Sequence, residues 1–226
     1  MNRPYEALSQ RVAAAAQRAR RAVRLLAVSK TQAAAAVREL AGAGQHAFGE
    51  NYVQEARAKQ RELADLNLQW HMIGPLQSNK CRDVAEHFDW LQSLDREKLV
   101  AGLNRFRADD QPPLNVLIQV NIDDESSKSG CAPEAISLLA EKIVQAPRLR
   151  LRGLMAIPLP HPAMDQRRRS FRRMRALFDT LRNAHPAIDT LSLGMSDDFE
   201  LAIAEGATMV RIGTALFGVR NRTVPS

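Results

Sequence analysis

The sequence predicts an α/β protein that folds as a single (β/α)8 barrel of the TIM type with an extra N-terminal helix. Short apolar segments with strand character alternate along the chain with amphipathic segments of helical spacing. Eight such strands can be traced, and each connection between them is long enough for a right-handed crossover. Because no linker, low-complexity segment or internal repeat interrupts this alternation, we expect residues 1–226 to form one domain.

The N-terminal segment, residues 1–23, is rich in arginine and alanine and contains one acidic residue, Glu6. Such a composition is also found in transit peptides. Its apolar side chains, however, recur on one helical stripe that consists of Leu8, Val12, Ala15, Ala19 and Val23. We therefore expect this segment to be a folded helix that packs on the barrel.

The strands are predicted from short apolar runs that end at polar or turn-forming residues. We expect them over residues 25–29, 46–49, 69–74, 89–94, 114–120, 149–155, 188–193 and 208–212. Helices are expected between them, over residues 33–41, 50–65, 96–106, 133–145 and 196–205, from residue 76 onward and after Pro162. Only residues 213–226 follow the last strand, so we expect the N-terminal helix to cover that side of the barrel.

The charge of the chain favours anionic partners, since the formal net charge is +7 and the pI is near 10.0. Many of the arginines lie between Arg167 and Arg175, where Phe171 and Met174 recur at helical spacing. This stretch therefore predicts an amphipathic helix with a solvated basic face. Aromatic residues make up only 5% of the chain, too few for a base-stacking platform, so we expect no nucleic-acid partner.

The remaining composition favours a cytoplasmic protein. No apolar run approaches the roughly 20 residues that cross a bilayer, and the N-terminal segment lacks the apolar core of a signal peptide. Cys81 and Cys131 have no metal-ligand spacing, which is typical of two reduced thiols. We expect a monomer without a membrane partner or a bound metal.

Lys30 directly follows the first predicted strand, at the edge where α/β folds bind their ligands. A lysine that is partly shielded at this edge can act as an amine. Most lysines after a strand are solvated loop residues, so position alone does not assign chemistry to Lys30.

Phosphate groups often bind in such barrels between the loops that follow strands seven and eight. In this chain these loops contain Ser196, Gly213 and Thr214, which offer two hydroxyl donors and a close backbone approach. The alternative is that Ser196 or Asp197 caps the next helix.

Several motifs occur in one order along most of the chain. They are LAVSK at 26–30, GENY at 49–52, WHMIGPLQSNK at 70–80, GLMAIP at 153–158, LGMSDD at 193–198 and VRIGTALFG at 210–218. Together they resemble the YggS/PROSC family of pyridoxal 5′-phosphate (PLP) homeostasis proteins. The resemblance extends over about residues 25–218.

The resemblance implies a barrel similar to the N-terminal domain of alanine racemase, with PLP held as a Schiff base on Lys30. It implies that Arg211 faces the pyridine nitrogen, and an arginine there opposes protonation and weakens the cofactor as an electron sink. The other contacts that carry over are Asn51, which lines the site, and the phosphate contacts Ser196, Gly213 and Thr214.

The leading hypothesis is a carrier that holds PLP, buffers its free concentration and delivers it to apo-enzymes, without significant turnover and with no catalytic residue. One alternative is an amino-acid racemase of weak activity, for which Tyr52 is a candidate acid. Another is a nucleic-acid- or protein-binding module that uses the basic face between Arg167 and Arg175. Lys80 and Lys128 are candidates for a secondary PLP site.

Overall fold

The computed structural model describes residues 3–125 and 129–218 of the chain. Within these residues, eight parallel strands form a closed barrel in which each strand pairs with its neighbours in chain order and β8 pairs with β1. The predicted (β/α)8 fold is therefore confirmed. The strands are β1 (Arg24–Val28), β2 (Ala47–Glu50), β3 (Gln69–Met72), β4 (Trp90–Leu94), β5 (Leu114–Gln119), β6 (Leu149–Met155), β7 (Thr190–Ser192) and β8 (Met209–Ile212).

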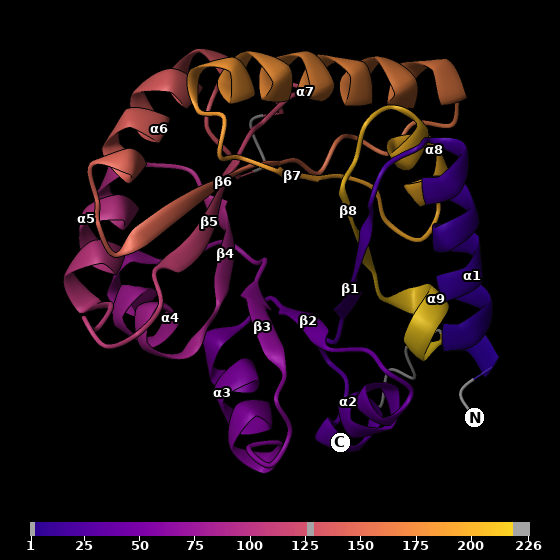
Figure 1. Cartoon of the computed structure of the whole chain (residues 1–226), viewed down its shortest axis with the longest axis horizontal. Helices are drawn as coiled ribbons and strands as arrows, with labels where there is room; N and C mark the ends of the chain where they lie inside the picture. The colour runs from indigo at the N-terminus through magenta and orange to yellow at the C-terminus, as the bar shows by residue number, and fades with distance from the viewer. Residues whose placement is uncertain (1–2, 126–128, 219–226) are drawn as a thin grey trace.

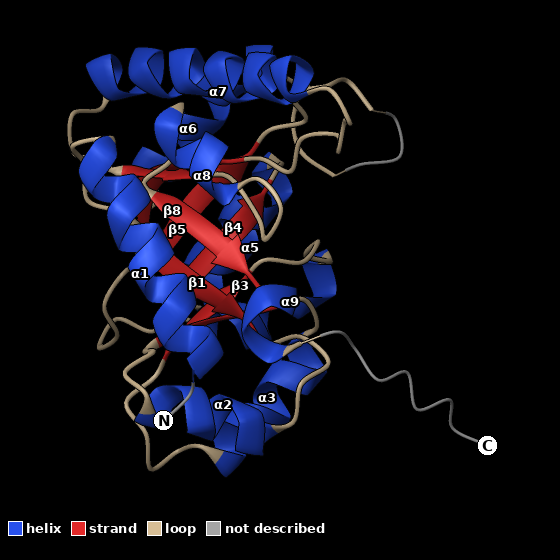
Figure 2. Ribbon diagram, turned by 90° about the vertical axis from the view of Figure 1, so that its right-hand side faces the viewer, coloured by secondary structure: helices blue, strands red, loops and turns tan. Residues whose placement is uncertain are grey.

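Helices surround the barrel, as Figures 1 and 2 show. They cover the outer face of the strands, while side chains fill the interior, so the strands are largely buried on both faces. The helices are α1 (Arg3–Arg18), α2 (Ala34–Gly42), α3 (Val53–Glu62), α4 (Cys81–His87), α5 (Glu97–Phe106), α6 (Ile136–Val144), α7 (Met164–Ala184), α8 (Phe199–Ala204) and α9 (Thr214–Phe217), with 3-10 turns at Ser78–Lys80 and Pro133–Ala135. None of the helices in the described ranges combines the length and apolar character needed to cross a bilayer.

The N-terminal helix α1 packs against α8 and α9, beside β1 (Figure 1). The predicted stripe holds, because Leu8, Val12 and Ala15 are buried while Ala19 and Val23 pack against the same core. Since α9 contains only four residues, α1 covers the side that a longer helix after β8 would cover. The helix ends at Arg18 rather than at the predicted residue 23, and Arg20 adopts a left-handed backbone with φ of 50°.

The helix after β7 begins later than predicted. α8 begins at Phe199 instead of Ser196, with Asp198 at the N-cap position. The Asp198 Oδ1 accepts a hydrogen bond of 2.7 Å from the Met195 backbone N–H, which stabilises the loop before the helix. Ser196 and Asp197 therefore lie in the loop, and the prediction that one of them caps the helix is wrong.

Helix α7 is amphipathic, as predicted. Its buried residues are Phe171, Met174, Phe178 and Leu181. On the solvated face, Arg168 and Arg172 both pair with Glu205, and Arg175 pairs with Asp179. The protein's own carboxylates thus offset part of the basic charge, although exposed ion pairs of this kind each contribute little stability.

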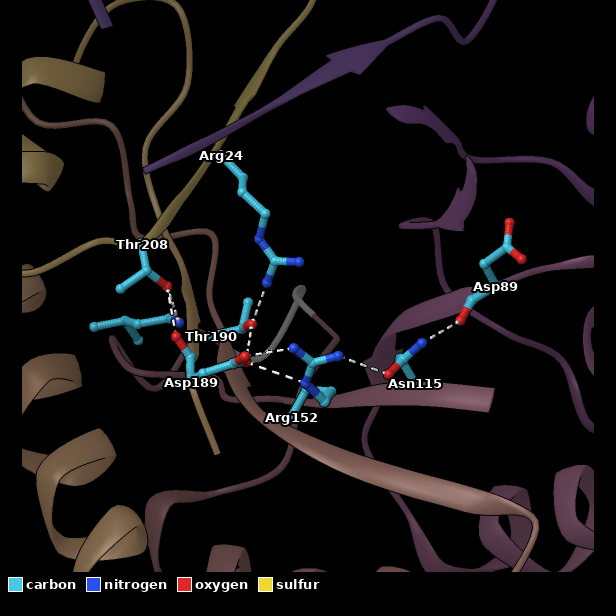
Figure 3. A network of polar contacts seen from close by, with 8 residues as sticks. Arg24, Asp89, Asn115, Arg152, Asp189, Thr190 and Thr208 are labelled. Atoms are coloured by element: carbon cyan, nitrogen blue, oxygen red, sulfur yellow. Dashed lines mark hydrogen bonds and ion pairs between the residues drawn. The ribbon is translucent and has the colours of Figure 1, made fainter. Parts of the chain in front are cut away.

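A polar network closes the barrel end at which the strands begin (Figure 3). The Arg24 and Arg152 guanidinium groups lie 4.9 and 4.8 Å from the centroid of the Trp90 ring. Arg24 donates a hydrogen bond to the Thr190 Oγ1, and Arg152 pairs with the Asp189 carboxylate. These contacts give both guanidinium groups partners beside the Trp90 ring, and they pair the Asp189 carboxylate.

Gly153 lies at an irregularity in the pairing of β5 with β6, where the register shifts between Val116 and Leu117. Its φ is +142°, and a Cβ built on it would lie 2.0 Å from the Thr190 carbonyl oxygen. Only glycine fits here, because any side chain would collide with the backbone of β7.

We expect Gly153→Ala to lower the free energy of unfolding by at least about 2 kcal/mol, through backbone strain and overpacking. Urea unfolding followed by circular dichroism measures this. Gly42→Ala is the matched control, because no atom lies within 4 Å of a Cβ at this helical position. It should leave stability unchanged or raise it by up to about 1 kcal/mol. Equal stability of the two variants would contradict the assignment.

Candidate functional site

A cavity of about 510 Å³ lies at the carboxyl ends of the barrel strands. It is bordered by the end of β1, the segment after β3 and the loops after β6, β7 and β8. All six site residues expected from the sequence line this cavity: Lys30, Asn51, Ser196, Arg211, Gly213 and Thr214. The closed barrel thus brings together residues that are up to 184 positions apart (Lys30 to Thr214).

Two of the three other candidates do not line the cavity. Lys80 is not among the lining residues, and its Nζ lies 4.0 Å from an Asp83 carboxylate oxygen. Tyr52, at the start of α3, is 60% exposed and does not line the cavity either. Lys128 lies outside the described residues. The structure therefore gives Tyr52 no place as an acid in the cavity.

Asn51 directly follows β2, and it lies against Gly74, two residues after the end of β3. A Cβ on Gly74 would lie 2.3 Å from the Asn51 carbonyl oxygen and 2.7 Å from its Cα. The absence of a side chain at Gly74 therefore lets the two segments pack backbone against backbone.

The loops after β7 and β8 meet at one edge of the cavity. The Arg211 backbone N–H donates a 3.0 Å hydrogen bond to the Gly194 carbonyl, which ties the start of one loop to the strand before the other. Ser196 comes from the first loop, and Gly213 and Thr214 come from the second. Two hydroxyl groups and a side-chain-free backbone segment thus border the same space, a donor set suited to an anion.

One carboxylate also borders this edge. Asp197 lines the cavity and is solvent-exposed, whereas Asp198 is bound to the Met195 N–H of its own loop. Water screens the charge of Asp197, so its repulsion of an anion is weaker than that of a buried carboxylate.

Arg211 extends from β8 into the cavity wall and is buried. Its Nη1 donates to the carbonyl oxygen and the hydroxyl of Ser192, at 2.8 and 2.7 Å, and its Nη2 donates to the Ala156 carbonyl at 2.9 Å. Burial lowers the pKa of Arg211 to about 10, an effect that the Asp198 charge opposes. The guanidinium is therefore cationic at neutral pH, and neutral acceptors hold it in place.

A chain of hydrogen bonds continues from Arg211 through the barrel interior. The Ser192 hydroxyl donates to the Gln92 Oε1 at 2.8 Å, and the Gln92 amide nitrogen lies 3.0 Å from the His71 Nδ1. Because an amide nitrogen only donates, the His71 Nδ1 accepts and its Nε2 carries the proton, which points to the Gln69 Oε1 at 3.0 Å. Each residue of this chain thus donates a hydrogen bond to the next one, in the direction away from the cavity.

His71 itself stacks on Trp90, with the ring centroids 5.1 Å apart. Burial lowers the pKa of His71 well below its ordinary value, and the Arg24 charge adds to this effect. His71 is therefore a packing and hydrogen-bonding residue. Sequence reasoning missed Gln92, which is followed by Ser93 in β4, and Ser192, which ends the short strand β7.

A lysine just after β1, a buried arginine on β8 and a donor-rich edge between the last two loops border one cavity of the closed barrel. The family model for the alanine racemase N-terminal domain matches residues 5–221, so the barrel is of the alanine racemase type. The chain is 56% identical over 222 residues to the pyridoxal phosphate homeostasis protein of Pseudomonas aeruginosa, a match that covers 97% of this chain and 95% of the relative. It is 54% identical to the protein of the same name from Escherichia coli K12, over 93% of each chain.

Among solved structures, PipY of Synechococcus elongatus with PLP bound has a TM-score of 0.80 and 41% identity, and the match covers 87% of this chain and 92% of PipY. The chain therefore belongs to the family of pyridoxal phosphate homeostasis proteins.

The neutral state of buried His71 predicts a pH dependence. The unfolded chain binds a proton at His71 below a pH of about 6.5, whereas the folded protein does not, so the free energy of unfolding falls as the pH falls. The loss approaches about 1.4 kcal/mol per pH unit. We expect His71→Asn to lose less stability than the unchanged protein between about pH 7.5 and 5.5. Urea unfolding at both pH values measures the difference, and parallel losses would rule out this origin.

Proposed function

We propose that this protein binds PLP in the cavity as a Schiff base on Lys30, buffers its free concentration and delivers it to apo-enzymes that depend on PLP. The observation that carries the proposal is the convergence of Lys30, Arg211 and the two loop hydroxyls on one cavity. The relatives named as pyridoxal phosphate homeostasis proteins and the PLP-bound PipY structure support it.

The residues present fit each part of the cofactor. Ser196 and Thr214, which border the cavity, would donate hydrogen bonds to the phosphate, and Gly213 would allow the backbone to approach it closely. The Lys30 amine would hold the aldehyde reversibly with loss of one water molecule, a capture without net change in oxidation state. Asn51 borders the same space.

When bound, PLP supplies an electrophilic aldehyde and a ring that withdraws electrons. Arg211 limits the second property, since a fixed cation against the ring nitrogen disfavours protonation there. The Ser192 and Ala156 acceptors leave this guanidinium little freedom to move away. We therefore infer tight holding with little carbanion chemistry.

The ionisable side chains around the cavity also favour holding over turnover. In the described ranges, the ionisable lining residues are Lys30, Asp197 and Arg211. Of these, Asp197 is exposed to solvent. A racemase needs a second positioned acid or base, so the carrier function is favoured. The racemase remains the second candidate, because the family model is that of an alanine racemase domain.

Two further parts of the proposal concern the cellular setting. Cys81 and Cys131 are free and buried, and burial raises the pKa of Cys131 to about 11. Such thiols suit a reducing compartment, so we place the protein in the cytoplasm. A monomer that holds its cofactor in a single domain is the simplest form of this carrier.

Lys30→Ala should abolish the visible absorbance of a protonated Schiff base and the adduct that borohydride fixes on the protein. Lys80→Ala is the control and should keep both signals, since Lys80 lies outside the cavity lining. Absorbance spectra and peptide mapping after reduction measure the result. A stoichiometric adduct in Lys30→Ala would place the attachment at another lysine, with Lys128 the first to examine.

Carrier and racemase differ in the fate of the α-proton of an amino acid. The PLP-loaded protein should exchange the α-proton of alanine for deuterium far more slowly than the median enzyme turnover of about 10 s⁻¹. It should also activate an apo-transaminase when free PLP is trapped. NMR measures the exchange, and a coupled assay measures the activation. Exchange at enzyme-like rates would favour the racemase, and slow exchange without activation would reduce the function to storage.

A further inference from the structure

A buried cluster of charges lies beneath the turn that contains Lys30. It consists of Glu50 at the end of β2 and of Glu55 and Lys59 on α3, and we refer to it as the Lys59 cluster. The Lys59 Nζ lies 2.7 Å from the Glu50 Oε1 and 2.7 Å from the Glu55 Oε1. Lys59 is 5% exposed and Glu50 is fully buried.

The cluster binds the residues on both sides of Lys30. On the N-terminal side, the Lys59 Nζ donates to the Ser29 carbonyl at 2.6 Å, and the Ser29 hydroxyl donates to the Glu50 Oε1 at 2.6 Å. On the C-terminal side, the Thr31 backbone N–H donates to the Glu55 Oε1. The backbone that holds Lys30 is thus tethered before and after it to members of the same cluster.

Thr31 needs such a tether, because its backbone is strained. Its φ is +64°, a left-handed conformation that is unfavourable for a β-branched residue. The side chain is exposed, so packing against the core does not hold it in place. The bond from its N–H to Glu55 comes from another element and opposes relaxation of the turn.

Stability alone does not account for the buried charges. Burial raises the pKa of Glu50, and the Lys59 and Ser29 hydrogen bonds only oppose this effect. Replacing a buried ion pair with apolar residues is often neutral or stabilising. A cluster of this kind is therefore expected where it fixes a geometry that an apolar contact would leave free.

We propose that the Lys59 cluster is a positioning device for Lys30. It holds the strained turn of residues 29–31 so that the Lys30 amine faces the cavity in the geometry of Schiff-base formation. Lys59, Glu50 and Glu55 do not line the cavity. The inference rests on the proposed function, and it assigns the cluster to capture of the aldehyde rather than to binding of the phosphate or ring.

The test compares two ligands that share the phosphate and the ring. PLP has the aldehyde that Lys30 captures, whereas pyridoxine 5′-phosphate has an alcohol there and cannot form a Schiff base. Glu55→Ala is the main variant, because the Glu55 side chain is 27% exposed and its loss leaves the core intact. Lys59→Met is the second variant, and Glu62→Ala, an exposed glutamate on the same helix, is the matched control.

We expect Glu55→Ala to weaken PLP binding about tenfold, the effect of one lost hydrogen bond to a charged group. Pyridoxine 5′-phosphate should bind within about twofold of its original affinity. This ligand forms no bond to Lys30, so its affinity does not depend on how the turn holds the Lys30 amine. Lys59→Met should also weaken the binding of PLP, and Glu62→Ala should leave the affinity for both ligands unchanged. Titration followed by absorbance measures the affinity for PLP, and calorimetry measures the affinity for both ligands.

Rescue tests the strain directly. Glycine adopts a left-handed backbone without cost, so adding Thr31→Gly to Glu55→Ala should recover at least half of the lost PLP affinity, expressed as a logarithm. Equal losses for both ligands would overturn the proposal, because they would show a general role in the cavity. Unchanged PLP binding in both cluster variants, or no rescue, would overturn it too. Failure of the proposed function would appear separately, as the lack of a Lys30 adduct in the unchanged protein.

Discussion

The site depends above all on the pairing of the first strand with the last. β1 and β8 are in register from Arg24 opposite Met209 to Ala27 opposite Ile212. This register places the turn with Lys30 beside the loop with Gly213, where a Cβ would lie 3.2 Å from the Val28 carbonyl. In an open sheet the same residues would lie at opposite edges, so closure of the barrel creates the cavity.

The sequence predicted the barrel well because hydrophobic periodicity is a local signal. Lys30, Ser196 and Thr214 could be placed at one face by the rule that parallel strands end together, whereas Asn51 and Arg211 depended on the resemblance. The predicted start of α8 was wrong because Asp198 accepts a hydrogen bond from a loop N–H, a contact that residue spacing does not reveal. The Lys59 cluster was missed because its contacts join the turn after β1 to β2 and α3, which are separate in the sequence. In addition, a helix with charges of both signs is usually predicted to be exposed to solvent.

The barrel interior is polar at both ends, and each end is held differently. Near the cavity, Arg211 has neutral acceptors and a one-way chain through Ser192 and Gln92. At the other end, Arg152 is paired with the Asp189 carboxylate. A buried cation that donates to neutral acceptors keeps more of its field than one paired directly with a carboxylate, although the Asp198 charge also acts on Arg211. The Arg211 guanidinium therefore remains an effective positive charge at the cavity end.

Lys30 and Arg211 also differ in how they are supported, and this separates two properties of the site. Lys30 lies on a strained turn that is held by charged groups on α3 and at the end of β2. Arg211 lies on a strand and is held from inside the barrel. A change in one support need not disturb the other, since they share no residue. The position of the Lys30 amine and the charge at Arg211 can therefore vary independently, which suits the proposed function of a carrier that holds PLP with little turnover.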